Sequence, residues 1–260
     1  MRVSAPVASL VDDVAPGRWQ RQRELVLHER FLVLEETADW AFGQAGRDGY
    51  VGYIRRDLLV PDPGMMTHVV WQRQSYLAPV PDLKHARDEI EPVSFGTELA
   101  VVATHENGRW AEVARLRPQT ARADHKHTWT LYVPTAHLRP IDRAEADPVA
   151  VAMRFLGVPY HWGGNSGFGI DCSGLVQAAH LACAIACPGD SDQQAARLGQ
   201  PLPEGTPHAR GDLVFWPGHV GIMVDPERVV HATAHHMAVV VEDLAAVMKR
   251  AEEPALFRRL

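Results

Sequence analysis

Residues 160–177 read YHWGGNSGFGIDCSGLVQ, and they carry the strongest chemical signal in the chain. The segment changes from a glycine-rich loop into a run typical of a helix, and Cys172 lies at the junction. Backbone N–H groups in the first turn of a helix are unpaired and carry partial positive charge. This setting lowers the pKa of a cysteine below its free value of roughly 8.5 and offers donors to an oxyanion. The pattern therefore predicts a nucleophilic thiolate at Cys172.

Two histidines downstream are candidate partners for this cysteine. A cysteine nucleophile needs a base and a group that orients the base. His219 and His231 each lie among β-forming residues. A hairpin with a short turn at residues 225–228 would carry them on adjacent antiparallel strands. Taken alone, these residues can also be interpreted as a buried structural cysteine and two packed histidines. The chain contains 14 His, so a pair of this kind can arise by chance.

The residues around this segment read as helices followed by strands. Asp147 and Pro148 are typical of a helix N-cap and first turn, with the helix body at 149–156. A second helix is expected over residues 171–186. Strands are expected after it, at residues 213–216, 219–224, 228–232 and 237–241. Helices followed by an antiparallel sheet predict an α+β domain.

The first half of the chain reads as short strands separated by polar or glycine-containing turns. One set falls between residues 19 and 60, and Pro61–Gly64 interrupts it. A second set over residues 68–134 repeats the order of the first: apolar strand, acidic turn, Trp, strand, and a short turn before Leu. This layout resembles the small bacterial SH3-like barrel, which usually binds or positions something. We expect SH3-like domains at 1–64 and 65–142 and the α+β domain at 143–260.

The composition is that of an ordinary globular protein. Hydrophobic residues make up 46% of the 260 residues and charged residues 22%. A net charge of −6 and a pI of about 6.1 give no net positive field for nucleic acid or an anionic membrane. No stretch approaches the roughly 18 apolar residues of a membrane span, and the N-terminus lacks the pattern of a secretion signal. We expect a cytoplasmic protein.

The remaining cysteines, Cys183 and Cys187, lie in an Ala-rich segment at helical spacing. On one helix they would share a face, and we interpret them as small buried hydrophobic residues. A total of three cysteines does not favour a disulfide framework. No nearby His or acidic residue completes a set of metal ligands. The sequence therefore predicts neither a metal nor a cofactor.

A series of motifs in the C-terminal part resembles the NlpC-type cell-wall cysteine peptidases. The motifs are Tyr-x-Trp-Gly-Gly from Tyr160, Asp-Cys-Ser-Gly-Leu-Val at 171–176, Gly-Asp-Leu-Val-Phe-Trp at 211–216, His-Val-Gly-Ile at 219–222 and Val-His-Ala at 230–232. The resemblance spans about residues 148–241 and implies a reduced papain-like fold. Two SH3-like domains ahead of such a domain resemble the γ-D-glutamyl-L-diamino acid endopeptidases. The implied substrate is a murein peptide with a free N-terminal L-Ala, in cell-wall peptide recycling or turnover.

The resemblance also implies catalytic roles at individual positions. Cys172 matches the nucleophile and His219 the general base. His231 matches the third polar residue, which orients the base. Tyr160 matches a tyrosine that helps to stabilise the oxyanion.

Substrate-binding roles follow from the same resemblance. Asp171 and Ser173 match positions that hold the free amine and backbone of the first peptide residues, and Ser191 matches a serine near the D-glutamyl group. The first SH3-like domain of such enzymes lends a tyrosine to the S2 subsite, for which Tyr50 is the candidate, with Glu24 as an acidic contact. Helix capping by Asp171 and barrel packing by Tyr50 stay open as alternatives.

One departure concerns the residues before Ser191. The family often has Leu-Pro-Arg there, whereas residues 187–189 are Cys-Pro-Gly. The charge near the D-glutamyl position therefore differs from the family pattern.

Two other functions fit the same resemblance. One is a catalytically inert protein that binds muropeptide or wall polymer, and the other is an amidase or acyltransferase on the same fold. All three catalytic positions are occupied, which argues against the inert protein. The expected partner is a murein-derived peptide, and the sequence indicates neither the preferred diamino acid nor an oligomeric state.

Overall fold

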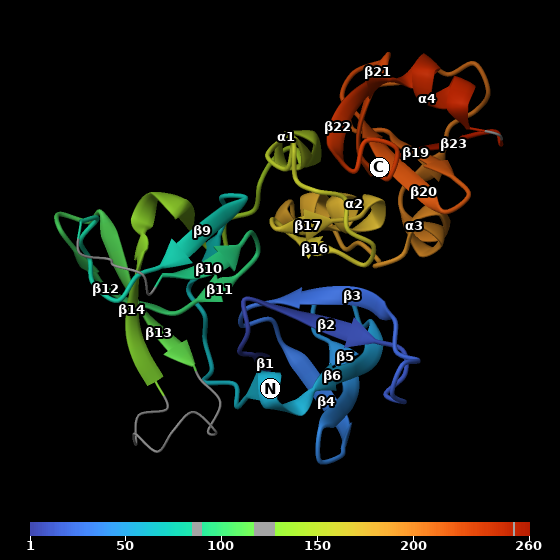
Figure 1. Ribbon diagram of the computed structural model, residues 1–260. Helices are drawn as coiled ribbons and strands as arrows, with labels where there is room; N and C mark the ends of the chain where they lie inside the picture. The colour runs from blue at the N-terminus through green and yellow to red at the C-terminus, as the bar shows by residue number, and fades with distance from the viewer. Residues whose placement is uncertain (85–89, 117–127, 252) are drawn as a thin grey trace. The chain divides into compact units, whose positions relative to one another are not determined.

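The computed structural model describes residues 1–84, 90–116, 128–251 and 253–260. These residues form two compact units, Met1–Arg143 and Ala144–Leu260 (Figure 1). None of the described helices has the length and apolar character that crossing a bilayer demands.

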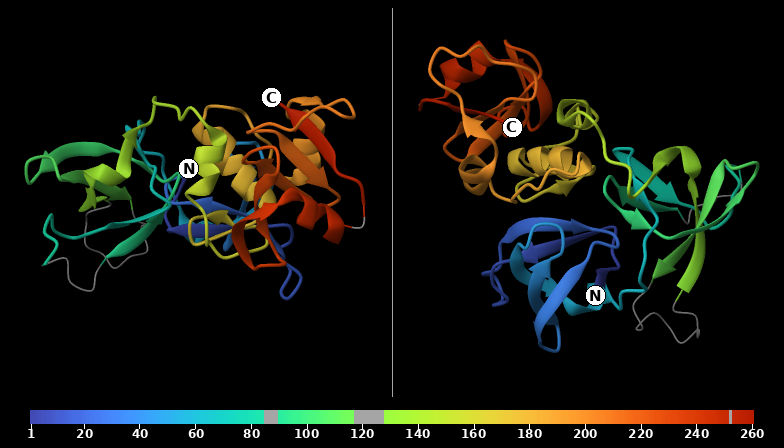
Figure 2. Two further views of the ribbon diagram at one scale, coloured as in Figure 1. Left: turned by 90° about the horizontal axis from the view of Figure 1, so that it is seen from above. Right: turned by 180° about the vertical axis from the view of Figure 1, so that it is seen from behind.

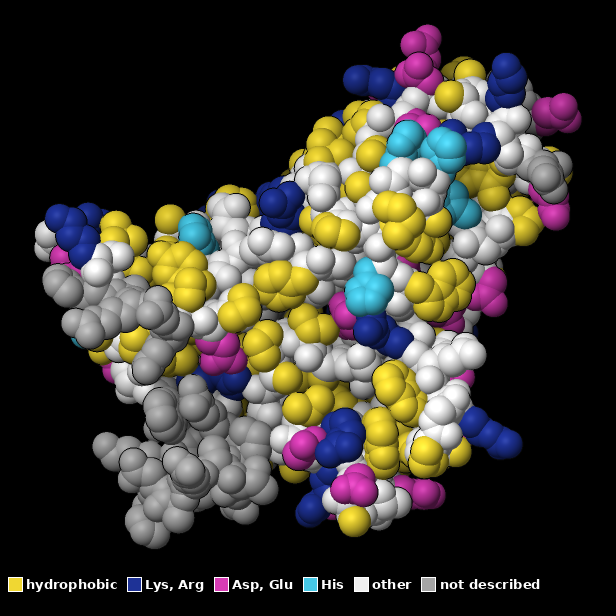
Figure 3. Space-filling view, viewed as in Figure 1, with side chains coloured by type: hydrophobic (Ala, Val, Ile, Leu, Met, Phe, Trp, Pro, Cys, Tyr) yellow, Lys and Arg dark blue, Asp and Glu magenta, His cyan; other side chains and the backbone are white. Residues whose placement is uncertain are grey.

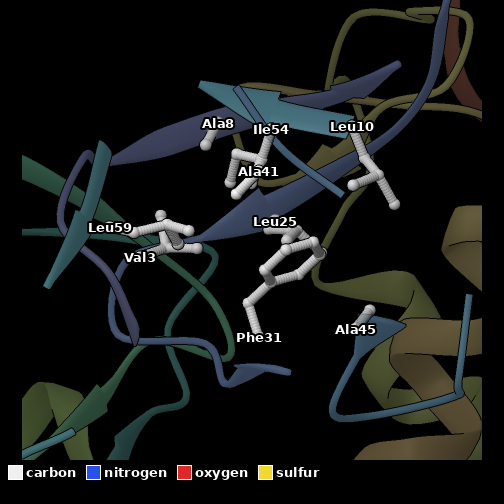
Figure 4. Close-up of a cluster of buried hydrophobic side chains, with 9 residues drawn as sticks. All are labelled: Val3, Ala8, Leu10, Leu25, Phe31, Ala41, Ala45, Ile54 and Leu59. Atoms are coloured by element: carbon white, nitrogen blue, oxygen red, sulfur yellow. The ribbon is translucent and has the colours of Figure 1, made fainter. Parts of the chain in front are cut away.

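The first barrel is an antiparallel sheet in the order β3-β2-β6-β5-β4. Its strands are β2 (Val7–Val11), β3 (Arg21–Val26), β4 (Phe31–Glu36), β5 (Trp40–Ala45) and β6 (Val51–Arg55). A short pair, β1 (Arg2–Val3) with β7 (Leu59–Val60), and the 3-10 turn η1 (Arg56–Leu58) complete it. Side chains alternate between buried and half-buried along β5, as expected for a strand with one face in the core. The core (Figure 4) consists of Val3, Ala8, Leu10, Leu25, Phe31, Ala41, Ala45, Ile54 and Leu59.

The second barrel consists of small antiparallel sheets in the orders β11-β8-β15, β12-β13-β14 and β10-β9. Their bounds are β8 (His68–Val70), β9 (Gln74–Leu77), β10 (Glu91–Ser94), β11 (Glu98–Leu99), β12 (Val101–His105), β13 (Trp110–Leu116), β14 (Thr128–Pro134) and β15 (Leu138–Pro140). The 3-10 turn η2 (Thr135–His137) lies between β14 and β15. The element order strand, turn, Trp-led strand, strand and 3-10 turn thus occurs in both barrels.

The two barrels share buried contacts, so they form one compact unit. Leu27, just after β3, packs into the core of the second barrel. The guanidinium of Arg2, which is fully buried, pairs with Asp62 at 2.7 Å and with Glu98 at 2.6 Å. Arg115 donates to the carbonyl oxygen of Ser4 at 2.6 Å. These links cross between segments that the sequence predicts to belong to separate domains.

The C-terminal unit combines helices with an antiparallel sheet in the order β18-β23-β19-β20-β21-β22 (Figures 1 and 2). The strands are β18 (Gln200–Pro201), β19 (Leu213–Trp216), β20 (His219–Met223), β21 (Arg228–Thr233), β22 (Ala238–Asp243) and β23 (Leu256–Arg259). The helices are α1 (Pro148–Met153), α2 (Cys172–Ala182), α3 (Ser191–Arg197) and α4 (Leu244–Arg250). A short hairpin, β16 (Asn165–Ser166) with β17 (Gly169–Ile170), precedes α2. This α+β arrangement and the all-β first unit confirm the predicted fold class.

Helices α1, α2 and α4 of this unit contact the sheet. Helix α2 contacts β20, β21 and α1. Residues of α4 form an apolar cluster with β19, β20 and β21, made of Val214, Trp216, Met223, Val229, Leu244 and Val247. The start of α2 is therefore held beside the strand that begins at His219.

Helix α2 is shorter than the sequence predicts. It ends at Ala182, and Ala184 adopts a left-handed conformation with φ of 58°. The N–H of Ile185 then bonds back to the carbonyl of His180 at 3.0 Å, which closes the helix end. Cys183 is half-buried at the C-cap and Cys187 is buried beyond it, so the prediction that they share a helix face is wrong.

Candidate active site

Asp171 caps the helix that begins at Cys172. One carboxylate oxygen accepts from the backbone N–H of Gly174 at 2.6 Å, and the other accepts from that of Gly163 at 2.9 Å. The Ser173 hydroxyl donates to the same carboxylate at 3.1 Å. Asp171 therefore satisfies helix N–H groups and ties the preceding loop to the helix. The capping alternative for Asp171 is thus observed, and both Asp171 and Ser173 are buried.

The first turn of α2 lies against the loop so closely that it requires glycine. A Cβ atom added at Gly174 would lie under 3.0 Å from the carbonyl oxygen of Gly164. Real Cβ atoms do not approach backbone oxygens so closely. Gly174 thereby lets the glycine-rich loop pack directly on the turn that carries Cys172.

The sulfur of Cys172 lies against the backbone on both sides of His219. It is 4.0 Å from the carbonyl oxygen of Gly218, and the N–H of Val220 hydrogen-bonds to it. The backbone N–H of Ser173 and that of Cys172 itself point at the sulfur as well. Helix packing thus places the candidate nucleophile beside the strand end that holds the candidate base.

The predicted lowering of the thiol pKa is wrong. Burial, and then the negative charge of Asp171, raise the pKa of Cys172 to about 12. The N–H groups of the helix start and of Val220 act in the opposite direction, but burial outweighs them. Cys172 is only 7% exposed. The N–H groups of the helix start therefore favour a thiolate that has almost no contact with water. In the resting protein the sulfur is a thiol.

His219 and His231 lie side by side on neighbouring strands. Nε2 of His219 is 2.8 Å from Nδ1 of His231. Strands β20 and β21 pair antiparallel, and they lie close together at Gly221, where an added Cβ would be 2.5 Å from Cγ2 of Val229 and 3.3 Å from Cβ of His231. The ring of Trp216 stacks on His219 with centroids 5.6 Å apart. The structure therefore brings together the two histidines that the sequence singles out.

A carboxylate that was not predicted from the sequence holds the second histidine. Glu242 on β22 is 2.9 Å from Nε2 of His231. Arg250 on α4 donates to both oxygens of Glu242, at 3.1 and 2.9 Å. His236 approaches the same carboxylate at 3.2 Å. Histidine side chains gather on the visible face over these C-terminal strands, next to basic side chains (Figure 3).

Both imidazoles are neutral at neutral pH. Burial, followed by the charges of His231 and Arg250, lowers the pKa of His219 to about 4, although Glu242 opposes this. Burial also lowers the pKa of His231, against the hydrogen bond and charge of Glu242. A neutral imidazole can accept a proton, so His219 is in the form that a general base requires.

Tyr160 lies next to the loop that leads into α2. It bridges to Ile170, and its backbone N–H donates to the carbonyl oxygen of Met237 at 2.9 Å. Burial raises the pKa of its phenol to about 12, and the negative charge of Asp171, together with that of Cys172 when its thiol is ionised, adds to the shift. The phenol is therefore close enough to Cys172 to feel its charge, and it keeps its proton as a hydrogen-bond donor.

Ser191 is the first residue of α3, and Gln194 ties this helix to the start of α2. The side-chain amide of Gln194, which is fully buried, donates to the carbonyl oxygens of Ser173 and Pro188, each at 2.9 Å. The segment before Ser191 is thereby fixed to the residue that follows the cysteine. Gln194 was not predicted to have a role, because one buried glutamine has no periodic or motif signal of its own.

Tyr50 and Glu24 belong to the other compact unit. Tyr50 packs against the core of the first barrel, and the guanidinium of Arg23 lies 5.4 Å from its ring centroid. Glu24 is buried and pairs with Arg21 at 3.3 Å. Barrel packing thus accounts for the position of Tyr50, and both substrate roles stay predictions.

The described residues contain no group of three or more His, Cys, Asp and Glu side chains placed to hold a metal ion. Two family profiles match the sequence. That of the NlpC/P60 family matches residues 157–252, and that of the bacterial dipeptidyl-peptidase SH3 domain matches residues 14–59.

Curated relatives match parts of the chain at moderate identity. The γ-D-glutamyl-L-lysine dipeptidyl-peptidase of Bacillus subtilis (strain 168) is 32% identical over 230 residues, which are 81% of this chain and 72% of that protein. Dipeptidyl-peptidase 6 of Lysinibacillus sphaericus is 39% identical over 89 residues, 33% of this chain. That match spans only 31% of the Lysinibacillus protein.

A solved structure shares the fold along nearly the whole chain. The NlpC/P60 family protein from Bacillus cereus ATCC 10987 superposes with a TM-score of 0.77 at 19% identity. The match covers 99% of this chain and 98% of that one.

Proposed function

Because this chain belongs to the NlpC/P60 family, we propose that it is a cysteine peptidase that hydrolyses the γ-D-glutamyl-L-diamino acid bond of murein peptides. The relative of which it covers 72% is named a γ-D-glutamyl-L-lysine dipeptidyl-peptidase. The side chains that would carry this chemistry all lie in the C-terminal unit: Cys172, His219, His231 and Tyr160.

The observation that carries the proposal is the hydrogen-bonded pair of imidazoles beside a buried sulfur. Nε2 of His219 and Nδ1 of His231 are 2.8 Å apart, and the sulfur of Cys172 touches the backbone on either side of His219. A nucleophile, a base and a group that orients the base are the parts that acyl transfer needs.

The acylation step begins with a proton transfer that accompanies attack. His219 takes the proton of the Cys172 thiol, and the sulfur forms a bond to the γ-carbonyl carbon of the D-glutamyl residue. The helix N–H groups and the phenol of Tyr160 stabilise the resulting oxyanion. Since the thiol is protonated at rest, the thiolate forms only as the carbonyl is attacked.

The two products then leave in turn. His219 donates its proton to the departing amine of the diamino acid as the C–N bond breaks, which leaves a thioester on Cys172. His219 then takes a proton from water, and the hydroxide adds to the thioester carbonyl. The tetrahedral adduct collapses with cleavage of its C–S bond to give the free γ-carboxyl group, and the thiolate of Cys172 regains its proton from His219.

Substrate recognition depends on the free amine of the N-terminal L-Ala. We assign this amine to the neighbourhood of Asp171 and Ser173, where the buried carboxylate would offset its charge and the hydroxyl oxygen would accept a hydrogen bond. Ser191 would lie near the D-glutamyl group. Tyr50 and Glu24 of the first barrel would close the subsite for the L-Ala residue.

The domain and compartment assignments are part of the same proposal. The chain would consist of SH3-like domains at 1–64 and 65–142 and a peptidase domain at 143–260. A peptide with a free N-terminal L-Ala has already been released from its glycan, so the enzyme would act in recycling or turnover inside the cell. Fractionation of cells that produce the full-length protein tests the compartment.

A digest of defined peptides tests the substrate. We expect L-Ala-γ-D-Glu linked to L-Lys or to diaminopimelate to yield the dipeptide L-Ala-D-Glu and the diamino acid, as seen by mass spectrometry. N-acetylation of the L-Ala should reduce kcat/KM by at least about tenfold, because the charged amine is lost. Cleavage at another bond, or equal cleavage of the acetylated peptide, would refute the substrate assignment.

A further inference from the structure

Both carboxylate oxygens of Glu242 are in contact with cationic or imidazole groups. Arg250 on α4 takes both carboxylate oxygens, at 3.1 and 2.9 Å. His231 on β21 takes one of them at 2.9 Å, and His236, in the turn before β22, approaches the other at 3.2 Å. The Glu242 side chain is only 13% exposed, so these contacts rather than water determine its state.

The charge of Glu242 decides which nitrogen of His231 carries a proton. Burial raises the pKa of Glu242, but hydrogen bonds from Arg250, His236 and His231 outweigh it and bring the value to about 2. A carboxylate only accepts hydrogen bonds, so Nε2 of His231 must carry a proton and donate it. His231 is neutral because burial lowers its pKa, and Nδ1 of the same ring is therefore bare.

The bare nitrogen of His231 in turn decides the tautomer of His219. Nδ1 of His231 faces Nε2 of His219 at 2.8 Å, so the proton in this hydrogen bond belongs to Nε2 of His219. Neutral His219 then has its unshared electron pair on Nδ1. That atom is the ring nitrogen left to receive the proton of the Cys172 thiol.

We propose that Glu242, held by Arg250, is a positioning residue that fixes His231 and, through it, His219 in the tautomer whose Nδ1 takes the thiol proton. The inference rests on the proposed function, because it assigns a task within the same reaction. It adds Glu242 and Arg250 to a site that sequence resemblance limits to Cys172, His219, His231 and Tyr160.

The two new residues act on the imidazoles with opposite charge. Once His219 holds the thiol proton, the resulting cation is attracted by Glu242 and repelled by Arg250. The titratable groups around Glu242 are His231 from β21, His236 from the turn and Arg250 from α4. Loss of the carboxylate and loss of the guanidinium must therefore shift the histidine titrations in opposite directions.

Nitrogen-15 NMR of the full chain tests the tautomers without a substrate. In the wild type we expect Nε2 to be protonated and Nδ1 bare in both His219 and His231 at pH 7. Glu242→Gln should lower the titration midpoints of both rings and relax the fixed tautomer of His231. Arg250→Gln should raise the midpoints, since the carboxylate then acts alone. A proton on Nδ1 of His219 in the wild type, or shifts of one sign in both variants, would overturn the inference.

Kinetics of the same variants separate positioning from mere stability. Glu242→Gln should lower kcat/KM on the order of 10- to 100-fold. It should also move the acid limb of the pH profile of kcat/KM to lower pH, whereas Arg250→Gln should move that limb to higher pH. The matched control is Glu145→Gln, which removes a carboxylate that pairs with Arg154 at both oxygens in the same unit. The control should leave unchanged both the titration midpoints of the two histidines and the acid limb of the pH profile of kcat/KM.

The two proposals fail in distinguishable ways. If the wild type cleaves no murein peptide while the tautomers and opposite shifts are as expected, the proposed function fails, and what stands is that Glu242 fixes the tautomers of His231 and His219. If cleavage occurs but Glu145→Gln shifts the acid limb of the pH profile as strongly as Glu242→Gln does, the positioning role fails.

Discussion

At Cys172 and His219, burial shifts two pKa values away from each other. The pKa of the thiol rises to about 12, and the pKa of the imidazole falls to about 4. Both shifts favour the neutral form, because a buried charge costs more than a buried neutral group. The pair therefore rests as thiol and imidazole, and the thiolate must form during attack on a carbonyl.

Alkylation of Cys172 should reveal this resting state. The rate constant for iodoacetamide at Cys172, resolved by peptide mass mapping, should keep rising about tenfold per pH unit from pH 8 to beyond pH 10, because only the thiolate reacts. The rate constant for the same cysteine in urea-unfolded protein should level off above the ordinary pKa of a free thiol, roughly 8.5. A plateau in the folded protein below pH 8 would show an ionised sulfur and contradict the assignment.

The reacting side chains could be predicted from the sequence, but the groups that tune them could not. Cys172, His219 and His231 lie in recognisable motifs, whereas Glu242 and Arg250 lie at the end of a strand and of a helix, where charged residues are usually solvated. Only the pairing of β21 with β22, which sets Val229 opposite Glu242, brings this carboxylate to His231. The wrong pKa prediction for Cys172 has a similar cause, because burial depends on tertiary packing.

At the scale of elements, the site lies between the first turn of α2 and the start of β20. The glycine-rich loop before α2 packs closely on that first turn. Substitution Gly174→Ala tests this approach, since the added Cβ would press on the carbonyl oxygen of Gly164. We expect the free energy of unfolding, from urea titration, to fall by about 1–3 kcal/mol, with a loss of peptidase activity. An unchanged unfolding midpoint would show that the loop can move to accept the methyl group without lowering the free energy of unfolding.

The sheet contributes a pH dependence through its buried imidazole. The folded pKa of His219, about 4, lies below its unfolded value of 6.5, so the unfolded state binds more protons between these values. Stability should therefore be complete above pH 6.5 and fall as the pH drops toward 4, by up to about 3 kcal/mol from His219. Urea unfolding of the wild type and of His219→Gln checks this, and an equal slope in both proteins would contradict it.

Local sequence signals predicted the elements that form the site, and long-range pairing accounts for those that were missed. The strand at residues 213–216 and the cap and first residue of α1 agree with their predictions. Strand β23 (Leu256–Arg259) was not predicted, because it pairs with β18 and β19 across a long sequence separation. The end of α2 was placed too late because Ala184 takes a left-handed φ that alanine rarely adopts.

At the scale of the whole molecule, each compact unit has a core of its own. The first unit has separate apolar clusters for its two barrels, and the second has a cluster between α4 and the sheet. Links such as the ion pair of Arg2 with Glu98 join the barrels, which explains why they form one compact unit although their sequences repeat.

Residues 144–260 alone should fold cooperatively, because they form a compact unit with its own sheet and helices. Under the proposed role of Tyr50, this fragment should cleave murein peptides with a raised KM and a reduced preference for a free L-Ala amine. Tyr50→Ala in the full chain should change the same preference with little change in kcat. A fragment with the same preference as the full chain would remove Tyr50 and Glu24 from the substrate site.

The most direct measurement compares the wild type with Cys172→Ala on L-Ala-γ-D-Glu-L-Lys and its diaminopimelate counterpart, with circular dichroism and the unfolding midpoint as checks on folding. The wild type should release L-Ala-D-Glu, and the variant should keep its fold while kcat/KM falls on the order of 10³-fold or more. Release of the dipeptide by the folded variant at a rate close to that of the wild type would show that the sulfur of Cys172 is not the nucleophile.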